Sequence, residues 1–233
     1  MKAKDVMTED VVSVAPDASV QSIARLLLER RISAVPVIGA DGRLRGIVSE
    51  GDLMRRAETR TERHVSWWLE LVDGREGSAE RYLKSHGLVA RDVMTPKPVT
   101  VTERMPLERI ATLLERNRIK RVPVLRGSKV VGIVSRANLL HALVAAADRP
   151  TRRRNASAPS RKEVLREIRA AGQSLDFVNV VVEGAVVHLW GGVEGQAERK
   201  AIALAARRSP GVSEVRNHLV VMPPRLVGSM GAQ

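Results

Sequence analysis

Residues 46–53 read GIVSEGDL and residues 132–139 read GIVSRANL. In each stretch a β-branched apolar run stands directly before a serine, and a carboxylate or an amide follows three residues after that serine. This pattern is typical of a strand that passes straight into a helix, with the serine at the helix N-terminus. Its occurrence twice in one chain indicates an internal repeat.

Further motifs repeat at nearly the same spacing. The sequence DVMT at 5–8 recurs at 92–95, and the pattern I-x-x-V-P-V at 32–37 recurs at 119–124, both at an offset of 87 residues. One residue is lost in the turn that follows, so the two GIVS segments match at an offset of 86. Two copies that differ by one turn residue indicate duplication rather than chance.

Each copy predicts the same order of elements: strand, helix, strand, strand, helix. In the first copy, residues 12–14 alternate as a short strand, residues 17–30 show helical spacing, and 34–38 and 44–48 predict strands joined by a turn at Asp41-Gly42. The fold class is therefore α+β, built from two βαββα repeats. The apolar face of the first predicted helix comprises Val20, Ile23, Ala24, Leu27 and Leu28.

A separate unit follows a basic segment. The chain carries a net charge of +13, and residues 149–162 contribute six basic side chains and no acidic one. This Pro-containing segment is typical of an extended, solvated tether. Beyond it, residues 162–171 and 196–208 predict helices, 177–193 predict a hairpin and 212–221 predict a strand. The C-terminal unit is therefore expected to have the order αββαβ.

Strand alternation in the hairpin sets an expectation for one polar residue. His188 stands between Val187 and Leu189, so we expect its side chain to face solvent. The insert between the repeats contains Trp67 and Trp68, which suit either an ordinary packing helix or a dimer contact. The predicted domains are the first repeat at 1–57, the helical insert at 58–88, the second repeat at 89–147, the basic linker at 148–160, the C-terminal unit at 161–222 and a frayed tail at 223–233.

Composition excludes several classes of site. There is no cysteine, so neither a disulfide nor a thiolate nucleophile is available, and the chain is expected to be soluble and cytoplasmic. The five histidines form no H-x-x-x-H pair, and neither a G-x-x-x-x-G-K-[ST] loop nor a G-x-S-x-G motif occurs. Catalysis is therefore not expected.

Ser49 and Asp52 allow two interpretations. They match a capping box, in which the two side chains satisfy the helix's unpaired N–H groups. They also suit a ligand, because a helix N-terminus with a hydroxyl attracts phosphate and a nearby carboxylate can accept from both hydroxyls of a ribose. The residues alone leave both interpretations open.

The paired motifs DVMT, I-x-x-V-P-V and G-I-V-S-x-x-[DN]-L resemble tandem CBS domains, which pair into a Bateman module, over residues 2–146. The run VVEGAVVHLWGGV and the later S-P-G-V resemble a BON domain over residues 160–222. The CBS resemblance implies a regulatory site for an adenine nucleotide or related ligand, such as AMP, ATP or S-adenosylmethionine, with no covalently bound cofactor. It also implies a homodimer formed through the CBS module.

By this resemblance Ser49 would meet phosphate, Asp52 the ribose, and the apolar residues the adenine. In the second copy Asn138 replaces the acid, while Arg136 and Arg121 add positive charge near the phosphates. The first copy is therefore expected to be the better-formed site. The implied nucleotide-binding residues are Ile32, Ala34, Pro36, Ile47, Ser49 and Asp52 in the first copy, and Ile119, Arg121, Pro123, Ile133, Ser135, Arg136 and Asn138 in the second.

The BON resemblance implies a phospholipid or a protein as partner. An alternative interpretation is a protein that associates with nucleic acid or an anionic membrane through the basic linker and the BON-like unit. Only 2% of the residues are aromatic, so few base-stacking platforms are available and nucleic acid is the less favoured partner.

Overall fold

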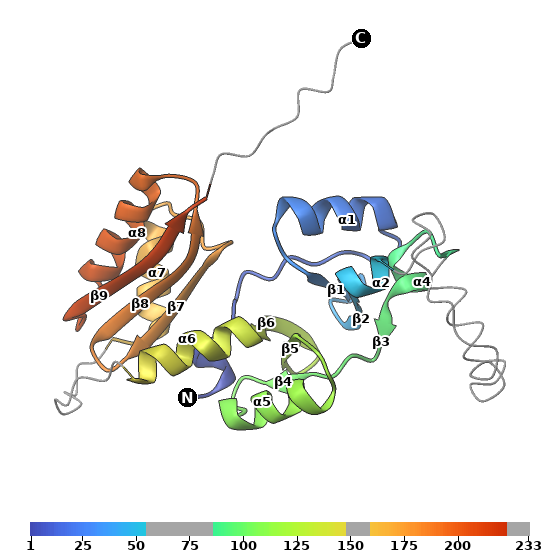
Figure 1. Ribbon diagram of the computed structural model, residues 1–233, viewed down its shortest axis with the longest axis horizontal. Helices are drawn as coiled ribbons and strands as arrows, with labels where there is room; N and C mark the ends of the chain where they lie inside the picture. Colours follow the sequence, from blue (N-terminus) through green and yellow to red (C-terminus); the bar gives the residue numbers. More distant parts are fainter. Residues whose placement is uncertain (55–85, 148–158, 223–233) are drawn as a thin grey trace, which may run out of the picture. The chain divides into compact units, whose positions relative to one another are not determined.

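The computed structural model describes residues 1–54, 86–147 and 159–222 (Figure 1). The predicted insert helices with Trp67 and Trp68, most of the basic linker and the predicted tail lie outside the described residues. The chain divides into two compact units. We call residues 11–102 and 122–133 the repeat unit, and residues 1–10, 103–121 and 134–233 the C-terminal unit.

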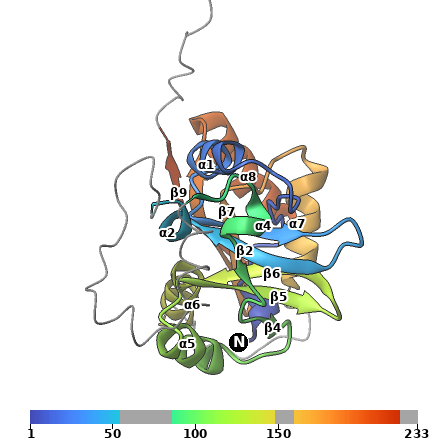
Figure 2. The same ribbon diagram turned by 90° about the vertical axis from the view of Figure 1, so that its right-hand side faces the viewer.

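The repeat unit holds the first repeat and most of the strands of the second. Its two three-stranded sheets have the orders β1-β2-β3 and β4-β5-β6, and β5 and β6 run side by side as a long ribbon (Figure 2). The alternation of helices and mixed strands confirms the α+β class. The elements are α1 (Val20–Glu29), β1 (Ala34–Ile38), β2 (Leu44–Ser49), α2 (Glu50–Leu53), α4 (Ala90–Val93), β3 (Thr95–Pro96), β4 (Val101–Thr102), β5 (Arg121–Arg126) and β6 (Lys129–Ser135).

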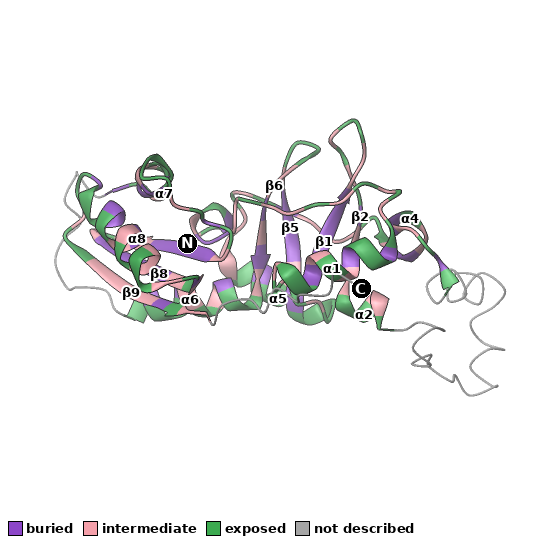
Figure 3. Cartoon of the chain, turned by 90° about the horizontal axis from the view of Figure 1, so that it is seen from above, coloured by how far each residue is buried: buried purple, intermediate pink, exposed green. Residues whose placement is uncertain are grey.

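Strand β1 forms because AVPVI is rich in β-branched residues, and its place at the edge of the sheet explains why Pro36 is tolerated. It pairs antiparallel with β2, with Val35 opposite Val48, and these two side chains are buried in the core. Figure 3 colours most of β1 as buried. The tight turn between the strands has Gly42 at a φ of 74°, a conformation that glycine adopts without strain. The core of the first repeat comprises Val20, Ile23, Leu27, Val35, Val37, Val48, Ala90 and Val93.

Helix α1 confirms most of its predicted apolar face. Ser19 caps it by accepting a hydrogen bond from the Ser22 N–H at 3.1 Å. Leu28 is an exception, because its side chain is 79% exposed. Successive residues are rotated by 100° around a helix axis, so the Leu28 side chain lies outside the buried stripe formed by Val20, Ile23 and Leu27. The expectation that Leu28 lies on the buried face is wrong for the chain described here.

Within this second unit, residues 161–222 confirm the predicted order αββαβ. Its sheet has the order β7-β8-β9, with β7 antiparallel and β9 parallel to β8. The elements of this unit are the 3-10 helix η1 (Ala3–Asp5), α5 (Leu107–Arg116), α6 (Arg136–Ala147), α7 (Arg161–Ala170), β7 (Val178–Glu183), β8 (Val186–Val193), α8 (Gln196–Arg208) and β9 (Glu214–Val221).

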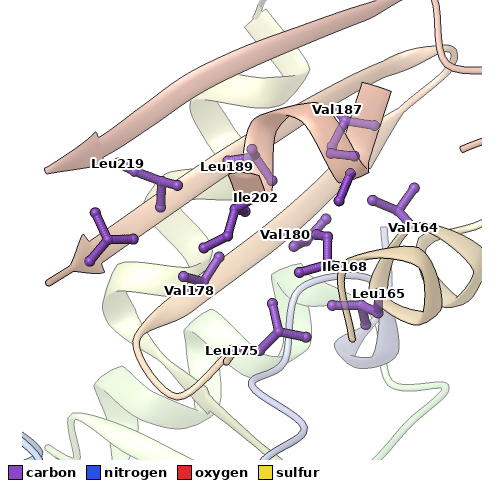
Figure 4. Close-up of a cluster of buried hydrophobic side chains, with 13 residues drawn as sticks. Val164, Leu165, Ile168, Leu175, Val178, Val180, Val187, Leu189, Ile202 and Leu219 are labelled. Atoms are coloured by element: carbon purple, nitrogen blue, oxygen red, sulfur yellow. The ribbon is translucent and has the colours of Figure 1, made fainter. Parts of the chain in front are cut away.

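Helices α7 and α8 cover one face of this sheet and enclose its hydrophobic core (Figures 1 and 4). Alternate strand residues point into it, among them Val187 and Leu189 of β8, as the period of two requires. The buried members of the core are Val164, Leu165, Ile168, Leu175, Val178, Val180, Val187, Leu189, Val193, Ile202, Ala205, Ala206 and Leu219.

The opposite face of the sheet carries His188, and the expectation that this residue faces solvent is wrong. Its side chain is 0% exposed. Alternation correctly places His188 on the face away from the core, but α6 packs against that face, where the His141 ring stacks on Trp190. A strand pattern shows which residues share a face and cannot show what covers that face.

The Arg161 side chain joins the N-terminal segment, residues 1–10, to strand β7. Its guanidinium donates to the Val180 carbonyl at 2.6 Å, to the Met7 carbonyl at 2.6 Å and to Glu9 Oε1 at 2.7 Å. The side chain is only 10% exposed. Burial lowers the pKa of the guanidinium, and the Glu9 carboxylate opposes this effect. Arg161 belongs to the six basic residues of segment 149–162. Because it is buried and hydrogen-bonded within the protein, it is unavailable to bind a phosphate from outside.

We expect Arg161→Ala to lower the free energy of unfolding by about 2–4 kcal/mol, because it removes the donors to the Val180 and Met7 carbonyls and the nearer of the two cations that pair with the partly buried Glu9. Arg166→Ala is the matched control, since Arg166 is exposed on the same helix and its one ion pair among the described residues is with Glu167 at 3.5 Å. The control should change stability by no more than about 0.5 kcal/mol. Urea unfolding followed by circular dichroism measures both; equal losses in the two variants would contradict this account of Arg161.

Candidate functional site

The first repeat places a capping box where β2 passes into α2. Ser49 is the N-cap residue, and Asp52 Oδ2 accepts from the Ser49 N–H at 2.9 Å and from the Ser49 Oγ at 2.7 Å. The first helical N–H, that of Glu50, donates to the Ser33 carbonyl at 3.0 Å. The chain itself therefore satisfies part of the donor set at this helix end, and the capping interpretation of Ser49 and Asp52 is confirmed.

The second repeat builds the same junction with an amide. Asn138 Oδ1 accepts from the Ser135 N–H at 2.8 Å and from the Ser135 Oγ at 2.7 Å, and the Asn138 N–H returns a bond to Ser135 Oγ at 3.3 Å. The Arg136 N–H donates to the Lys120 carbonyl at 3.0 Å, as Glu50 does to Ser33 in the first repeat. The cap needs one acceptor oxygen, so aspartate and asparagine serve it equally.

Four of the predicted first-repeat residues come together on one face of the first sheet. In the antiparallel register Ala34 lies opposite Ser49, and Pro36 lies opposite Ile47. Directly opposed residues share a face, and so do residues two apart on a strand. These four residues therefore form one patch on the face away from Val35 and Val48. The patch adjoins the capping box because Ser49 belongs to both.

Two residues modify the predicted set. Ile32 precedes β1 and packs against the hydrophobic core of the first repeat. Thr95 was not predicted, yet strand β3 pairs it directly with Ile47, which places it on the same face as the patch. The repeated DVMT motif, which ends at Thr8 and Thr95, was the available signal, but the sequence does not show that the second copy of the motif adds a strand to the first sheet.

In the second repeat the predicted residues occupy the matching elements. Arg121 and Pro123 belong to β5, where Pro123 is buried as Pro36 is in β1. Ile133 belongs to β6, and Ile119 follows α5, where its N–H donates to the Leu114 carbonyl at 3.0 Å. Arg136 is exposed at the first position of α6.

Two further kinds of site are absent from the described residues. Within 1–54, 86–147 and 159–222, no three His, Cys, Asp or Glu side chains are grouped so that they could hold a metal ion. No helix in the same ranges has the length and apolar character needed to cross a bilayer.

Comparison with known proteins agrees with the geometry. Residues 3–58 and 90–145 match the CBS domain, and residues 159–223 match the BON domain. The chain is 34% identical over 140 residues to the CBS domain-containing protein CBSX1, chloroplastic, of Arabidopsis thaliana, which covers 58% of this chain and 59% of that protein. It is 32% identical over 155 residues to the uncharacterized protein MJ1426 of Methanocaldococcus jannaschii, covering 62% of this chain and 92% of that protein.

A solved structure shows the same fold. The crystal structure of CBSX2 in complex with AMP is 30% identical in sequence and superposes with a TM-score of 0.55, covering 64% of this chain and 99% of that one. The order helix, strand, strand, helix shared by the two repeats (α1-β1-β2-α2 and α5-β5-β6-α6), the two matched junctions and these comparisons lead to one conclusion. The chain belongs to the CBS domain family, as a tandem CBS protein with a C-terminal BON domain.

Proposed function

We propose that this chain is a non-enzymatic, cytoplasmic regulatory protein whose first CBS repeat binds an adenine nucleotide. The observation that carries the proposal is the patch of Ala34, Pro36 and Ile47 beside the Ser49–Asp52 junction. Apolar side chains suit the flat adenine ring, while a hydroxyl and a carboxylate suit the sugar-phosphate. The CBSX2 structure contains AMP, which makes AMP the first ligand to test, with ATP and S-adenosylmethionine after it.

The carboxylate distinguishes the two repeats. Asp52 accepts two hydrogen bonds from Ser49 through one oxygen, Oδ2, and the negative charge of a carboxylate suits it to accept hydrogen bonds from ribose hydroxyls. The amide oxygen of Asn138 has two lone pairs, and Ser135 supplies donors for both. We therefore expect the second repeat to offer a poorer acceptor for a ribose diol, and we propose the first repeat as the preferred site.

Two parts of the proposal concern assembly and relay. We expect a homodimer through the CBS module, which sedimentation velocity measures. The exposed side chains of Leu140 and Leu143 on α6 provide apolar surface for such an association. The BON domain is the proposed output, with a protein or an anionic phospholipid as its partner. Ligand binding must favour one of two arrangements of the chain for any such relay to operate.

Asp52→Asn tests the nucleotide site without disturbing the cap, because Asn138 shows that an amide makes the same two hydrogen bonds. We expect calorimetry to show AMP binding by the unaltered chain and binding weakened about tenfold or more in the variant, since a charge-assisted hydrogen bond is replaced by a neutral one. The thermal midpoint without ligand should be unchanged. Asp52→Ala, which removes the cap, should lower stability by about 1 kcal/mol.

Equal AMP affinity in the unaltered chain and in Asp52→Asn would show that Asp52 is only a cap and would contradict its ribose role. No binding of AMP, ATP or S-adenosylmethionine at millimolar concentration would contradict the sensor function as a whole.

Asn138→Asp is the reciprocal change. It preserves the acceptor oxygen of the second cap and adds the charge that the first repeat carries, so we expect it to create or strengthen a second site by about tenfold. Calorimetric stoichiometry is the measurement, with Asn117→Asp as the control because Asn117 is the C-cap of α5, where its side-chain amide donates to the Leu113 carbonyl. A stoichiometry unchanged by Asn138→Asp would show that the amide is not what limits the second repeat.

A further inference from the structure

A ladder of stacked rings joins α6 of the second repeat to the BON sheet. The His141 ring of α6 stacks on Trp190 of β8, with centroids 4.8 Å apart and planes 7° from parallel. The other face of Trp190 stacks on His218 of β9 at 3.8 Å and 10°. His218 in turn lies 5.9 Å from the parallel ring of His188. The indole is thus held between two imidazoles that come from segments far apart in the sequence.

Strand register defines the surroundings of the ladder. Asn179, Trp190 and His218 form one row across the sheet, on the face that α6 covers. In the next row, Val181, His188 and Arg216 lie side by side, and the row after that holds Glu183, Val186 and Glu214. The nearest charged group on this face is therefore a cation, Arg216, whose Nε donates to Glu214 at 2.8 Å. The two carboxylates stand two rows from the indole, about 13 Å along the strands.

Two other elements approach the ladder. Helix α6 carries one charged residue, Arg136, five positions before His141. In the N-terminal segment the Val6 carbonyl accepts from the Asn179 side chain at 2.8 Å, and the nearby carboxylates of Asp5 and Glu9 bond to the Lys2 N–H and to Arg161. Among the described residues, neither His141 nor His218 forms an ion pair with a carboxylate.

Ring nitrogens of the stack are shielded from water. Among them His141 Nδ1, Trp190 Nε1 and His218 Nε2 are buried and make no hydrogen bond within the described part of the chain. A neutral imidazole tolerates this environment at modest cost, whereas a buried imidazolium without an anionic partner is strongly disfavoured. The contact is therefore matched to the neutral form of His141.

We propose that the His141–Trp190–His218 stack is an acid-sensitive contact that holds α6 on the BON sheet while the His141 imidazole is neutral and loosens when this ring is protonated. The second repeat and the output domain would then be coupled at neutral pH and uncoupled in acid. This inference does not depend on nucleotide binding, because it rests on the rings and their burial alone.

The sign of the pH dependence follows from the histidine in α6. Burial lowers the pKa of His141 from its ordinary value of 6.5, Asn179 acts in the opposite direction, and the neighbouring His218 lowers it further. A histidine with a depressed folded-state pKa contributes fully to stability above 6.5, and the contribution falls as the pH drops below 6.5 toward the folded-state value. A protonated ring gains some attraction to the indole face, but the net depression shows that loss of solvation prevails.

Trp190 can report its own environment. In the full-length chain carrying Trp67→Phe and Trp68→Phe, it is the only tryptophan left of three. We expect the acrylamide quenching constant of its fluorescence to rise as the pH falls from 7.5 to 5.0, with a midpoint below 6.5. Adding His141→Phe and His218→Phe keeps planar rings on both faces of the indole and removes both protonation sites, so the rise should disappear.

His86→Phe is the matched control, because His86 is exposed and belongs to the repeat unit. It should leave the transition unchanged. A quenching constant that stays flat with pH, a midpoint above 6.5 or the same rise in the His141→Phe, His218→Phe chain would overturn the proposal. Circular dichroism verifies folding at each pH. If the doubly altered chain does not fold, the chain with native histidines still decides the question, because its quenching constant must rise as the pH falls if the proposal is correct.

Discussion

The hydrogen bonds between a serine and the side chain three residues later determine much of this structure. A strand that enters a helix leaves backbone N–H groups without partners. At Ser49 and Ser135 one acceptor oxygen takes both the N–H and the hydroxyl of the serine, which fixes the point where strand becomes helix. Because Ser49 also lies opposite Ala34, the same point fixes which residues of β1 face the core of the first repeat and which lie on the opposite face of the sheet, where Ala34 and Pro36 are also buried. The candidate nucleotide patch is thus a consequence of the cap.

Helix α6 connects the second cap to the output domain. Asn138 and His141 are three residues apart and so lie on the same side of the helix, one bonded to Ser135 and the other stacked on Trp190. A helix of 12 residues is stiff, so a displacement at its first turn would move the His141 ring against the indole. Arg161 adds a second attachment, because it binds Met7 and Glu9 of the N-terminal segment. The BON domain therefore makes side-chain contacts both with α6 of the second repeat and with the N-terminal segment.

Local patterns predicted the elements and the caps well. The β-branched run 34–38 forms a strand at those residues, and 196–208 forms a helix within the same bounds, because each pattern is decided by neighbours in the sequence. What failed depended on partners from distant segments. His188 is buried because α6 covers its face of the sheet, and Arg161 is buried by the N-terminal segment rather than solvated in the linker. Thr95 joins the patch only because β3 pairs with β2. For the site, the sequence identified the junction residues but could not weigh their role as a cap against their role in binding.

The central claim is that one repeat, and not both, has the acceptor that a ribose requires. Equilibrium dialysis of radiolabelled AMP against the unaltered full-length chain measures this directly. The account predicts one bound nucleotide per chain at saturation of the tighter site, since Asp52 and not Asn138 carries a carboxylate. Two sites of equal affinity per chain, or none, would contradict it.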